Sequence, residues 1–273
     1  MPKSKRSART KPQKSEPKTW EHRKPRVSKH RDRPHRADRV WLYGFHPVIA
    51  ALGNPDRTFH DLIVTDSAVN RLPPKLVHNP RIVSLQELDS TVGRDSVHQG
   101  VALQVSLLPE RDLEPTVFAC AEHNRPILFL DQVTDPHNVG AIFRSAAAFG
   151  VGALVTQDRH SPAETGILAK AASGMLENLP WVRVTNIARA LDAVAGHGYF
   201  RIGLDGSAET RLDQLTQDTR TCIVLGAEGA GLRRNTIEHC DCLARLAMAP
   251  GCESLNVSNA AAVALYDRTY RNL

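Results

Sequence analysis

The chain has 273 residues, of which 41% are hydrophobic and 23% are charged, and this composition is typical of a soluble globular protein with one large or two modest domains. No stretch approaches the ~18 consecutive apolar residues that a membrane-spanning helix needs, so we expect no membrane partner. The five cysteines are odd in number and lack the spacing of a disulfide framework, which indicates a reducing, cytoplasmic environment.

The net charge of +6 is unevenly distributed along the chain. Residues 1–39 contain 15 Lys or Arg and four Asp or Glu, a net charge of +11, whereas the rest of the chain has a net charge of −5. This basic arm lacks hydrophobic periodicity and cannot bury enough apolar surface to offset the entropy of ordering, so we predict that it is disordered on its own. A polyanion such as RNA is its natural partner. The alternative is a tail that only increases solubility or was added for expression.

Residues 40–108 are predicted to form a small α/β domain. The segment 41–52 reads as a short strand, a turn at Gly44 and a helix. Further strands are expected at 61–65, 81–84 and 100–106, with a short helix over 86–92. Residues 109–115 are polar, charged and bounded by prolines, so we place a domain boundary there and assign residues 109–123 to a linker.

The pattern changes in residues 124–273 to apolar strands that alternate with helices. Continuous apolar strands between helices are typical of a parallel sheet that is buried on both faces, so this part of the chain is predicted to be an α/β domain. A helix is expected after the first strand, as far as Phe149. The expected strands lie at 126–131, 153–156, 181–184, 200–204, 222–225 and 243–248.

Three segments place polar residues or glycines where an apolar strand ends, which is where ligand sites form in α/β sheets. The first, 131–145, contains Asn138 as a helix-cap candidate and places Gly140 and Arg144 on one helical face. The permanent charge of Arg144 suits a phosphate group. Taken alone, however, Asn138 is more often only a cap, and Arg144 only a surface cation.

The second segment, 223–232, is rich in glycine and carries Glu228. Glycines such as Gly226 allow tight turns and let the backbone approach a ligand closely. The segment contains Gly-x-x-Gly-x-Gly, but the dinucleotide fingerprint Gly-x-Gly-x-x-Gly is absent, and the loop comes late in the chain. A nicotinamide-dependent enzyme is therefore disfavoured.

The third segment, 246–265, follows the last predicted strand and contains an alanine-rich helix that Ser254 or Asn256 can open. Ser254, Asn256 and Ser258 stand at this helix start, where backbone N–H groups lack helical partners. Polar side chains there can orient a ligand. The alternative is ordinary helix capping.

A cluster of His239, Cys240, Cys242 and Cys252 precedes and overlaps the third segment. Zinc sites usually separate a pair of cysteine ligands by at least two residues, and the Cys-x-Cys arrangement lacks that gap. We therefore expect buried thiols and no bound metal.

The three segments, in this order, resemble the three signature motifs of the SpoU (TrmH) family of RNA 2'-O-ribose methyltransferases. The resemblance covers residues 40–273, and the combination is specific although each motif alone is not. Residues 40–108 are similar to the family's substrate-binding domain, with Tyr43-Gly-Phe-His-Pro-Val near the start and His98-Gln-Gly near the end. Three stretches look most like bacterial members that methylate a guanosine of 23S ribosomal RNA: Val133-Thr-Asp-Pro-His-Asn, Arg183-Val-Thr-Asn-Ile-Ala-Arg and Gly226-Ala-Glu-Gly.

The resemblance implies a SPOUT fold, in which the C-terminal segment of a parallel α/β sheet is threaded into a trefoil knot. Knots are rare exceptions to the rule that protein connections are unthreaded. The resemblance also implies a homodimer with cofactor pockets near the knots and the interface, S-adenosyl-L-methionine (SAM) as the methyl donor, and ribosomal RNA as the partner.

Residue roles follow from the same motif matching. Arg144 would contact the RNA phosphate and assist deprotonation of the ribose 2'-hydroxyl; because a guanidinium is a poor base, a phosphate-assisted route is preferred. The other expected active-site residues would orient Arg144, the ribose or the cofactor, and they are Asn138, Glu228, Ser254 and Asn256. Main-chain groups around Gly226, Leu246 and Leu255 would bind SAM, with Met248 nearby.

Two other functions remain open within this resemblance. A tRNA 2'-O-methyltransferase of the same family would share all three motifs, although the separate N-terminal domain favours ribosomal RNA. A non-catalytic RNA-binding or ribosome-assembly factor could retain the fold. The intact residues Asn138, Arg144, Glu228 and Asn256 argue against the second alternative.

Overall fold

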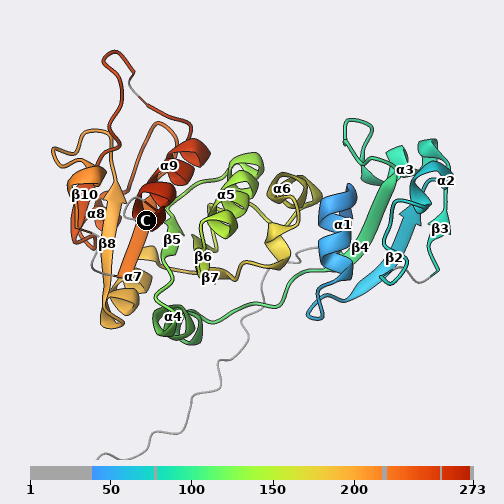
Figure 1. The fold of residues 1–273 in the computed structure, drawn as a ribbon, viewed down its shortest axis with the longest axis horizontal. Helices are drawn as coiled ribbons and strands as arrows, with labels where there is room; N and C mark the ends of the chain where they lie inside the picture. The colour runs from blue at the N-terminus through green and yellow to red at the C-terminus, as the bar shows by residue number, and fades with distance from the viewer. Residues whose placement is uncertain (1–38, 77–78, 217–219, 253, 271–273) are drawn as a thin grey trace, which may run out of the picture. The chain divides into compact units, whose positions relative to one another are not determined.

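The computed structural model of the chain describes residues 39–76, 79–216, 220–252 and 254–270. All but the last residue of the predicted basic arm therefore lies outside the described part. The described residues form one sheet of four strands and one of six (Figure 1). Within them, no helix has the length and apolar character needed to cross a membrane.

The first sheet is mixed and has the strand order β1-β4-β2-β3. The interior strand β4 has four buried and two half-buried residues, and it pairs antiparallel with both neighbours, whereas β2 and β3 are parallel. The elements are β1 (Arg39–Tyr43), α1 (Phe45–Leu52), β2 (Phe59–Val64), α2 (Asp66–Val69), β3 (Arg81–Ile82), α3 (Leu85–Val92) and β4 (Val101–Ser106). β3 is shorter than predicted because Ser84 caps α3, its hydroxyl accepting a hydrogen bond from the Glu87 N–H at 3.2 Å.

The segment 109–123, expected to be a linker, contains the ten-residue helix α4 (Leu113–Glu122). Pro115 stands in the first turn of this helix, where a backbone N–H would lack a helical partner, so the proline is tolerated. Val117, Cys120 and Ala121 are buried in the same cluster as one face of the second sheet. The prediction is corrected to this extent: most of the segment is a packed helix. The exact domain boundary stays a prediction.

All pairs in the second sheet are parallel, and the strand order is β10-β8-β9-β5-β6-β7. This confirms the parallel α/β sheet predicted from the apolar runs. Its strands are β5 (Ile127–Leu130), β6 (Ala153–Gln157), β7 (Trp181–Val184), β8 (Tyr199–Leu204), β9 (Arg220–Leu225) and β10 (Cys242–Ala244). β10 is shorter than the predicted strand 243–248, because the chain leaves the sheet after Ala244.

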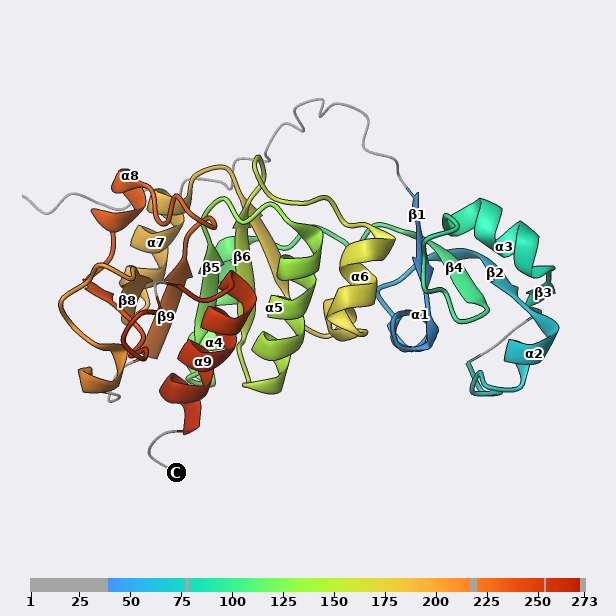
Figure 2. The same ribbon diagram turned by 90° about the horizontal axis from the view of Figure 1, so that it is seen from above.

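Helices cover both faces of the parallel sheet, which explains why its strands are apolar throughout. Along β5, Leu128 and Leu130 belong to the cluster with α5 (Pro136–Ala148), α6 (Gly166–Ala172) and α9 (Val257–Tyr270). Ile127 and Phe129 belong to the other cluster, with α4 and α7 (Ile187–Gly196). The helices around the sheet can be followed in Figure 2. The remaining short elements are η1 (Met175–Glu177), η2 (Leu212–Gln214) and α8 (Arg234–Ile237).

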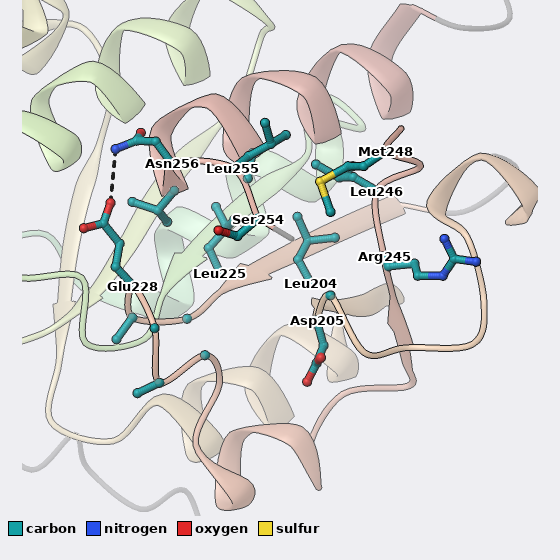
Figure 3. A pocket seen from close by; sticks show the side chains of 18 of the residues that line it. Leu204, Asp205, Leu225, Glu228, Arg245, Leu246, Met248, Ser254, Leu255 and Asn256 are labelled. Atoms are coloured by element: carbon teal, nitrogen blue, oxygen red, sulfur yellow. Dashed lines mark hydrogen bonds between the residues drawn. The ribbon is translucent and has the colours of Figure 1, made fainter. Parts of the chain in front are cut away.

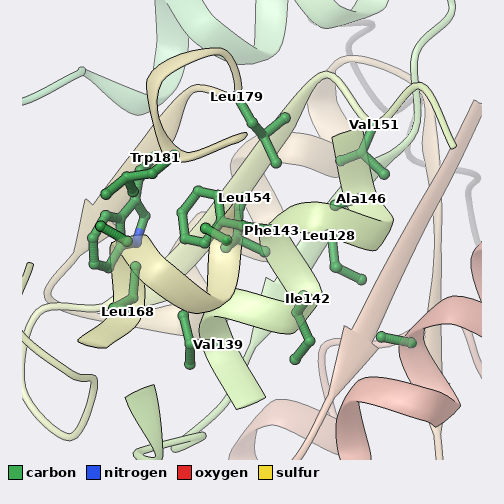
Figure 4. Packing of buried hydrophobic residues seen from close by; sticks show 14 of the residues in the cluster. Leu128, Val139, Ile142, Phe143, Ala146, Val151, Leu154, Leu168, Leu179 and Trp181 are labelled. Carbon is green, nitrogen blue, oxygen red and sulfur yellow. The ribbon is translucent and has the colours of Figure 1, made fainter. Parts of the chain in front are cut away.

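Helix α5 is held tightly against α6 and the sheet. A Cβ atom at Gly140 would lie 2.5 Å from both the Ala171 Cβ and the Leu168 carbonyl oxygen, so only glycine allows this approach of the two helices. The buried Phe143 ring packs edge-on against Trp181 with centroids 5.2 Å apart (Figure 4). This packing fixes the start of α5, where Asn138 lies.

Candidate active site

A cavity of about 720 Å³ lies at the carboxyl ends of β8, β9 and β10 (Figure 3). Ligands of open α/β sheets bind at this edge, and the volume is in the range of cofactor sites. The lining residues come from the ends of these strands, from the loops that follow them and from the start of α9: 204–206, 225–231, 244–246, Met248, 254–257 and Ala260.

The loop after β9 is closed on itself. Ala227 and Gly231 exchange two backbone hydrogen bonds of 3.1 and 2.9 Å, and Gly231 has a φ of 66°, a conformation that favours glycine. A Cβ atom at Gly226 would lie 2.2 Å from the carbonyl carbon of Gly231, so the loop can close only with glycine at this position. The closed loop presents its backbone and the Glu228 side chain to the cavity.

The segment after β5 differs from the prediction in which residue caps the helix. Asp135 is the N-cap of α5, and its carboxylate accepts hydrogen bonds from the N–H groups of His137 at 3.1 Å and Asn138 at 3.3 Å. Aspartate followed by Pro136 at the first helical position is a favourable helix start, so Asn138 lies inside the first turn. Its side-chain amide is thereby left for a tertiary contact.

Asn138, Glu228 and Asn256 form one hydrogen-bond network. The Glu228 Oε1 accepts hydrogen bonds from the Asn138 Nδ2 at 2.9 Å and from the Asn256 Nδ2 at 3.1 Å, the second of which is drawn in Figure 3. The Asn256 Nδ2 also donates to the Asn138 Oδ1 at 2.9 Å. The outermost of these residues are 118 positions apart in the chain. The network therefore unites all three of the segments identified from the sequence.

Asn256 has a second task at the start of α9. Its Oδ1 accepts hydrogen bonds from the Ser258 N–H at 2.9 Å and from the Ser258 hydroxyl at 2.5 Å, as an N-cap does. The cap predicted for this helix is thus present. It also orients the Asn256 amide so that Nδ2 faces Glu228.

The structure brings together all but one of the residues singled out from the sequence. Asn138 reaches the cavity through its bonds to Glu228 and Asn256. Arg144 is exposed on α5 and is not among the described residues that line the cavity, although Gly140, four positions earlier, is buried against α6. The expected site residues that line the cavity are Gly226, Glu228, Leu246, Met248, Ser254, Leu255 and Asn256.

Sequence reasoning missed the part of the cavity that follows β8. Leu204 and Asp205 line it, and the Asp205 Oδ1 accepts hydrogen bonds from the N–H of Ser207 at 2.8 Å and from its hydroxyl at 2.6 Å. The signal was the same as for the three recognised segments, because Asp205 is a polar residue directly after an apolar strand. Arg245, directly after β10, is a second lining residue that was missed.

The donors and walls of the cavity fit SAM. Leu204, Leu225, Leu246, Met248 and Leu255 provide apolar walls for a flat adenine and a thioether chain. The glycine-rich loop offers backbone N–H and C=O groups to the edges of a base or ribose. Glu228 adds an acidic side chain to the lining of the cavity, which suits a cationic sulfonium.

The cysteines near this region do not form a metal site in the part of the chain that the structure describes, where no group of three His, Cys, Asp or Glu side chains is placed to hold an ion. Burial raises the pKa of Cys240 to about 12, so its thiol stays protonated near neutral pH. Cys242 is half-buried. Cys252 is exposed, which corrects the expectation that it is a buried thiol.

Solved structures of methyltransferases share this fold. The SpoU methyltransferase AviRb from Streptomyces viridochromogenes in complex with AdoMet has a TM-score of 0.70 at 23% identity, covering 86% of this chain and 91% of that chain. An AdoMet-bound rRNA methyltransferase from Sinorhizobium meliloti has a TM-score of 0.71 at 19% identity, covering 86% and 88%. At these identities the likeness concerns the fold alone.

Sequence comparisons add the family. Residues 125–266 match the model of the SpoU rRNA Methylase family, and residues 41–110 match that of RNA 2'-O ribose methyltransferase substrate binding. Relatives named 23S rRNA (guanosine-2'-O-)-methyltransferase RlmB from Yersinia pestis and Xylella fastidiosa are 39% and 38% identical, each aligned over 83% of this chain, and over 95% and 94% of their own lengths. The chain therefore belongs to the SpoU rRNA methylase family.

Proposed function

We propose that this SAM-dependent RNA methyltransferase transfers the methyl group of SAM to the 2'-hydroxyl of a guanosine in 23S ribosomal RNA. The observation that carries the proposal is the network of Asn138, Glu228 and Asn256 at the rim of a cavity that fits SAM. The names of the relatives at 38–39% identity support 23S rRNA and guanosine as the target. A tRNA target is the second candidate, and the match of residues 41–110 to a substrate-binding model fits either RNA.

SAM brings a methyl group already activated on a sulfonium. The protein therefore has to align the ribose 2'-hydroxyl with this methyl group and assist removal of the hydroxyl proton. In the proposal, backbone groups around Gly226, Leu246 and Leu255 bind the adenosine part, and the Met248 side chain completes the wall. Backbone contacts explain how apolar residues can be binding residues: their side chains form the wall while their N–H and C=O groups read the ligand.

The exposed guanidinium of Arg144 is assigned to an RNA phosphate, because it is permanently charged and free to meet a large substrate at the surface of α5. The phosphate held by Arg144 assists removal of the 2'-hydroxyl proton, which is finally released to water, since a guanidinium is already protonated and is a poor base. Glu228 keeps its orientation because Asn138 and Asn256 both donate to the same carboxylate oxygen. Ser254, which lines the cavity, is assigned to the ribose or the cofactor.

The proposal includes a homodimer, the trefoil knot of the C-terminal segment, a cytoplasmic location and a division into a substrate-binding and a catalytic domain. An exposed aromatic cluster on α9 supports the dimer: Tyr266 is 58% exposed and Tyr270 is 39% exposed, and both rings contact Phe149. Val263, 49% exposed, lies one helical turn before Tyr266. Apolar surface of this kind is typical of interfaces, and a second copy of the chain is the proposed occupant.

RNA binding is assigned in part to the basic residues 1–39. Lysine and arginine side chains bind phosphates with release of counterions, so affinity falls as salt rises. Deleting residues 1–38 should weaken binding to an rRNA fragment and reduce the slope of log affinity against log salt. Equal affinity and equal slope for the full-length and shortened proteins would exclude this role.

The function is tested by incubating the purified protein with labelled SAM and either 23S rRNA or tRNA, followed by mapping of 2'-O-methyl groups. Methylation of a guanosine in 23S rRNA is the expected result. Methylation of tRNA alone would show that tRNA, and not 23S rRNA, is the substrate. Arg144→Ala should abolish transfer and leave SAM binding, measured by calorimetry, nearly intact. Loss of SAM affinity in this variant would show that the role assigned to Arg144 is wrong.

A further inference from the structure

Asp131 is a fully buried carboxylate at the carboxyl end of β5, next to the proposed active site but not part of the cavity wall. A buried charge is costly unless it is paired and hydrogen-bonded. The Arg233 Nε donates to Oδ1 at 2.7 Å, and the Arg233 Nη2 lies 2.6 Å from the same oxygen. The Thr236 hydroxyl donates to Oδ2 at 2.6 Å, and the Arg233 N–H donates to Oδ2 at 3.3 Å. All four of these contacts join the Asp131 carboxylate to residues about a hundred positions away in the chain.

These contacts close the base of the cavity loop 226–233. At the start of the loop, the Leu225 carbonyl oxygen accepts a hydrogen bond of 2.8 Å from the Asp131 N–H. At its end, Arg233 returns to the Asp131 side chain. One residue therefore anchors both ends of the loop that supplies Glu228 and much of the cavity wall.

The same residue begins the segment that leads to Asn138. Gln132 follows Asp131 with a φ of 62°, a left-handed conformation that turns the chain sharply away from the strand. Asp131 thus precedes the segment that carries Asn138 and contacts both ends of the loop that carries Glu228. The side chains of Asn138 and Glu228 form a hydrogen bond of 2.9 Å. A shift of the loop relative to β5 would separate this pair.

We propose that Asp131 and Arg233 are positioning residues for methyl transfer. Their ion pair holds the loop 226–233 so that its backbone walls the SAM cavity and Glu228 reaches Asn138 and Asn256. Buried ion pairs contribute little net stability compared with apolar packing, but they fix geometry because a guanidinium is rigid and directional. The Arg233 side chain is 39% exposed and belongs to neither apolar cluster, so replacing it removes no apolar contact from them, but it leaves the buried Asp131 without its cation.

The test compares Arg233→Ala with Arg234→Ala in the full-length protein. Arg234 is a matched control because it is the next residue, its side chain is 93% exposed, and among the described residues it pairs with Glu238 on the surface. Because small displacements of reacting groups are costly, Arg233→Ala should weaken SAM binding and lower kcat by about 10- to 100-fold. Arg234→Ala should leave the SAM dissociation constant within about twofold. Arg233→Lys, which keeps the charge but not the fork of donors, should recover part of the loss.

A double-mutant cycle with Glu228→Gln separates positioning from a general loss of stability. If Arg233 acts through the loop, Arg233→Ala should lower kcat far less in the Glu228→Gln background than in the wild type. Additive effects, or wild-type SAM affinity and kcat in a folded Arg233→Ala protein, would overturn the inference. If the alanine variant does not fold by circular dichroism, Arg233→Gln gives the same comparison.

The inference rests on the proposed use of the cavity for SAM. A wild-type protein that binds no SAM in calorimetry would refute that function. If the wild type binds SAM normally and the Arg233 variants keep its SAM affinity and kcat, only the positioning role is refuted.

Discussion

Substituting aspartate for Asn256 separates the two tasks of this side chain. Its Oδ1 caps α9 through Ser258, while its Nδ2 donates to Glu228 at 3.1 Å and to Asn138 at 2.9 Å. Aspartate has the same shape and is an equally good N-cap, so the start of the helix should remain intact. The donor, however, becomes an oxygen with negative charge beside the Glu228 carboxylate.

The size of the effect follows from these contacts. Losing a hydrogen bond to a charged group costs about 1.5 kcal/mol, a value from the lower end of the range because Glu228 and Asn256 are exposed. Two like charges at the 3.1 Å separation repel by about 1 kcal/mol in a water-like dielectric. If both terms act in the transition state, about 2.5 kcal/mol corresponds to a loss of roughly 50- to 100-fold in kcat/KM.

The assay measures kcat/KM with labelled SAM on an rRNA fragment, together with the midpoint of urea unfolding. Asn256→Ala is the companion variant: it should lose activity as well, and also about 1 kcal/mol of unfolding free energy through the lost cap. Asn256→Asp keeps the cap but also places a charge beside Glu228 in the folded protein, so its unfolding free energy should fall by no more than about 2.5 kcal/mol, the sum for the network contacts. A fully active Asn256→Asp enzyme would refute the role of the network. A larger loss of unfolding free energy in this variant would refute the separation of the two tasks.

Three further predictions concern the core, the cavity loop and a buried thiol. Phe143→Ala should reduce the unfolding free energy by about 3–5 kcal/mol in urea titrations, because its ring is fully buried, whereas the same change at Phe118, which is 54% exposed, should cost less than about 0.5 kcal/mol. Gly226→Ala should abolish SAM binding in calorimetry, since the new Cβ would lie 2.2 Å from a backbone carbon; Gly206→Ala, in the same cavity wall but without a described atom within 4 Å of its Cβ position, should bind SAM normally. Burial raises the pKa of Cys240 from 9.0 to about 12, so the unfolded thiol ionises first as the pH rises, and the unfolding free energy should fall between pH 9 and 12. Cys240→Ala should make this decline shallower, and an unchanged slope would contradict the assignment.

The parallel sheet could be predicted because its strands are buried on both faces. In β5, all four residues are apolar and alternate between two clusters, so the strand has no polar face and reads as a continuous apolar run. Helix α4 was missed for a local reason: Pro115 was taken as a linker residue, although a proline in a first turn breaks no helical hydrogen bond. β10 was predicted too long because Leu246 and Met248 are apolar, but their side chains line the cavity and do not belong to the sheet.

The sequence could predict which segments meet at the cavity, but not the contacts between them. Polar residues at strand ends pointed to the three segments, since parallel strands all end at one edge. The sequence predicted Asn138 as the cap of α5, whereas the structure shows that Asp135 is the cap. The pairing of Asp131 with Arg233 spans 102 positions, and no local pattern encodes it. Such partners depend on the strand order, which places β9 beside β5.

The polar network cannot hold its own geometry, because water competes for hydrogen bonds at exposed side chains and leaves each with little net stabilisation. Its precision has to come from the buried residues beside it. Asn138 precedes the fully buried Val139, and Asn256 precedes Val257, which is 6% exposed. Glu228 has no such neighbour, since Ala227 is half-buried and Gly229 is exposed. The loop that carries Glu228 is therefore the member of the network that most needs an anchor elsewhere, and the buried carboxylate of Asp131 lies at the base of that loop.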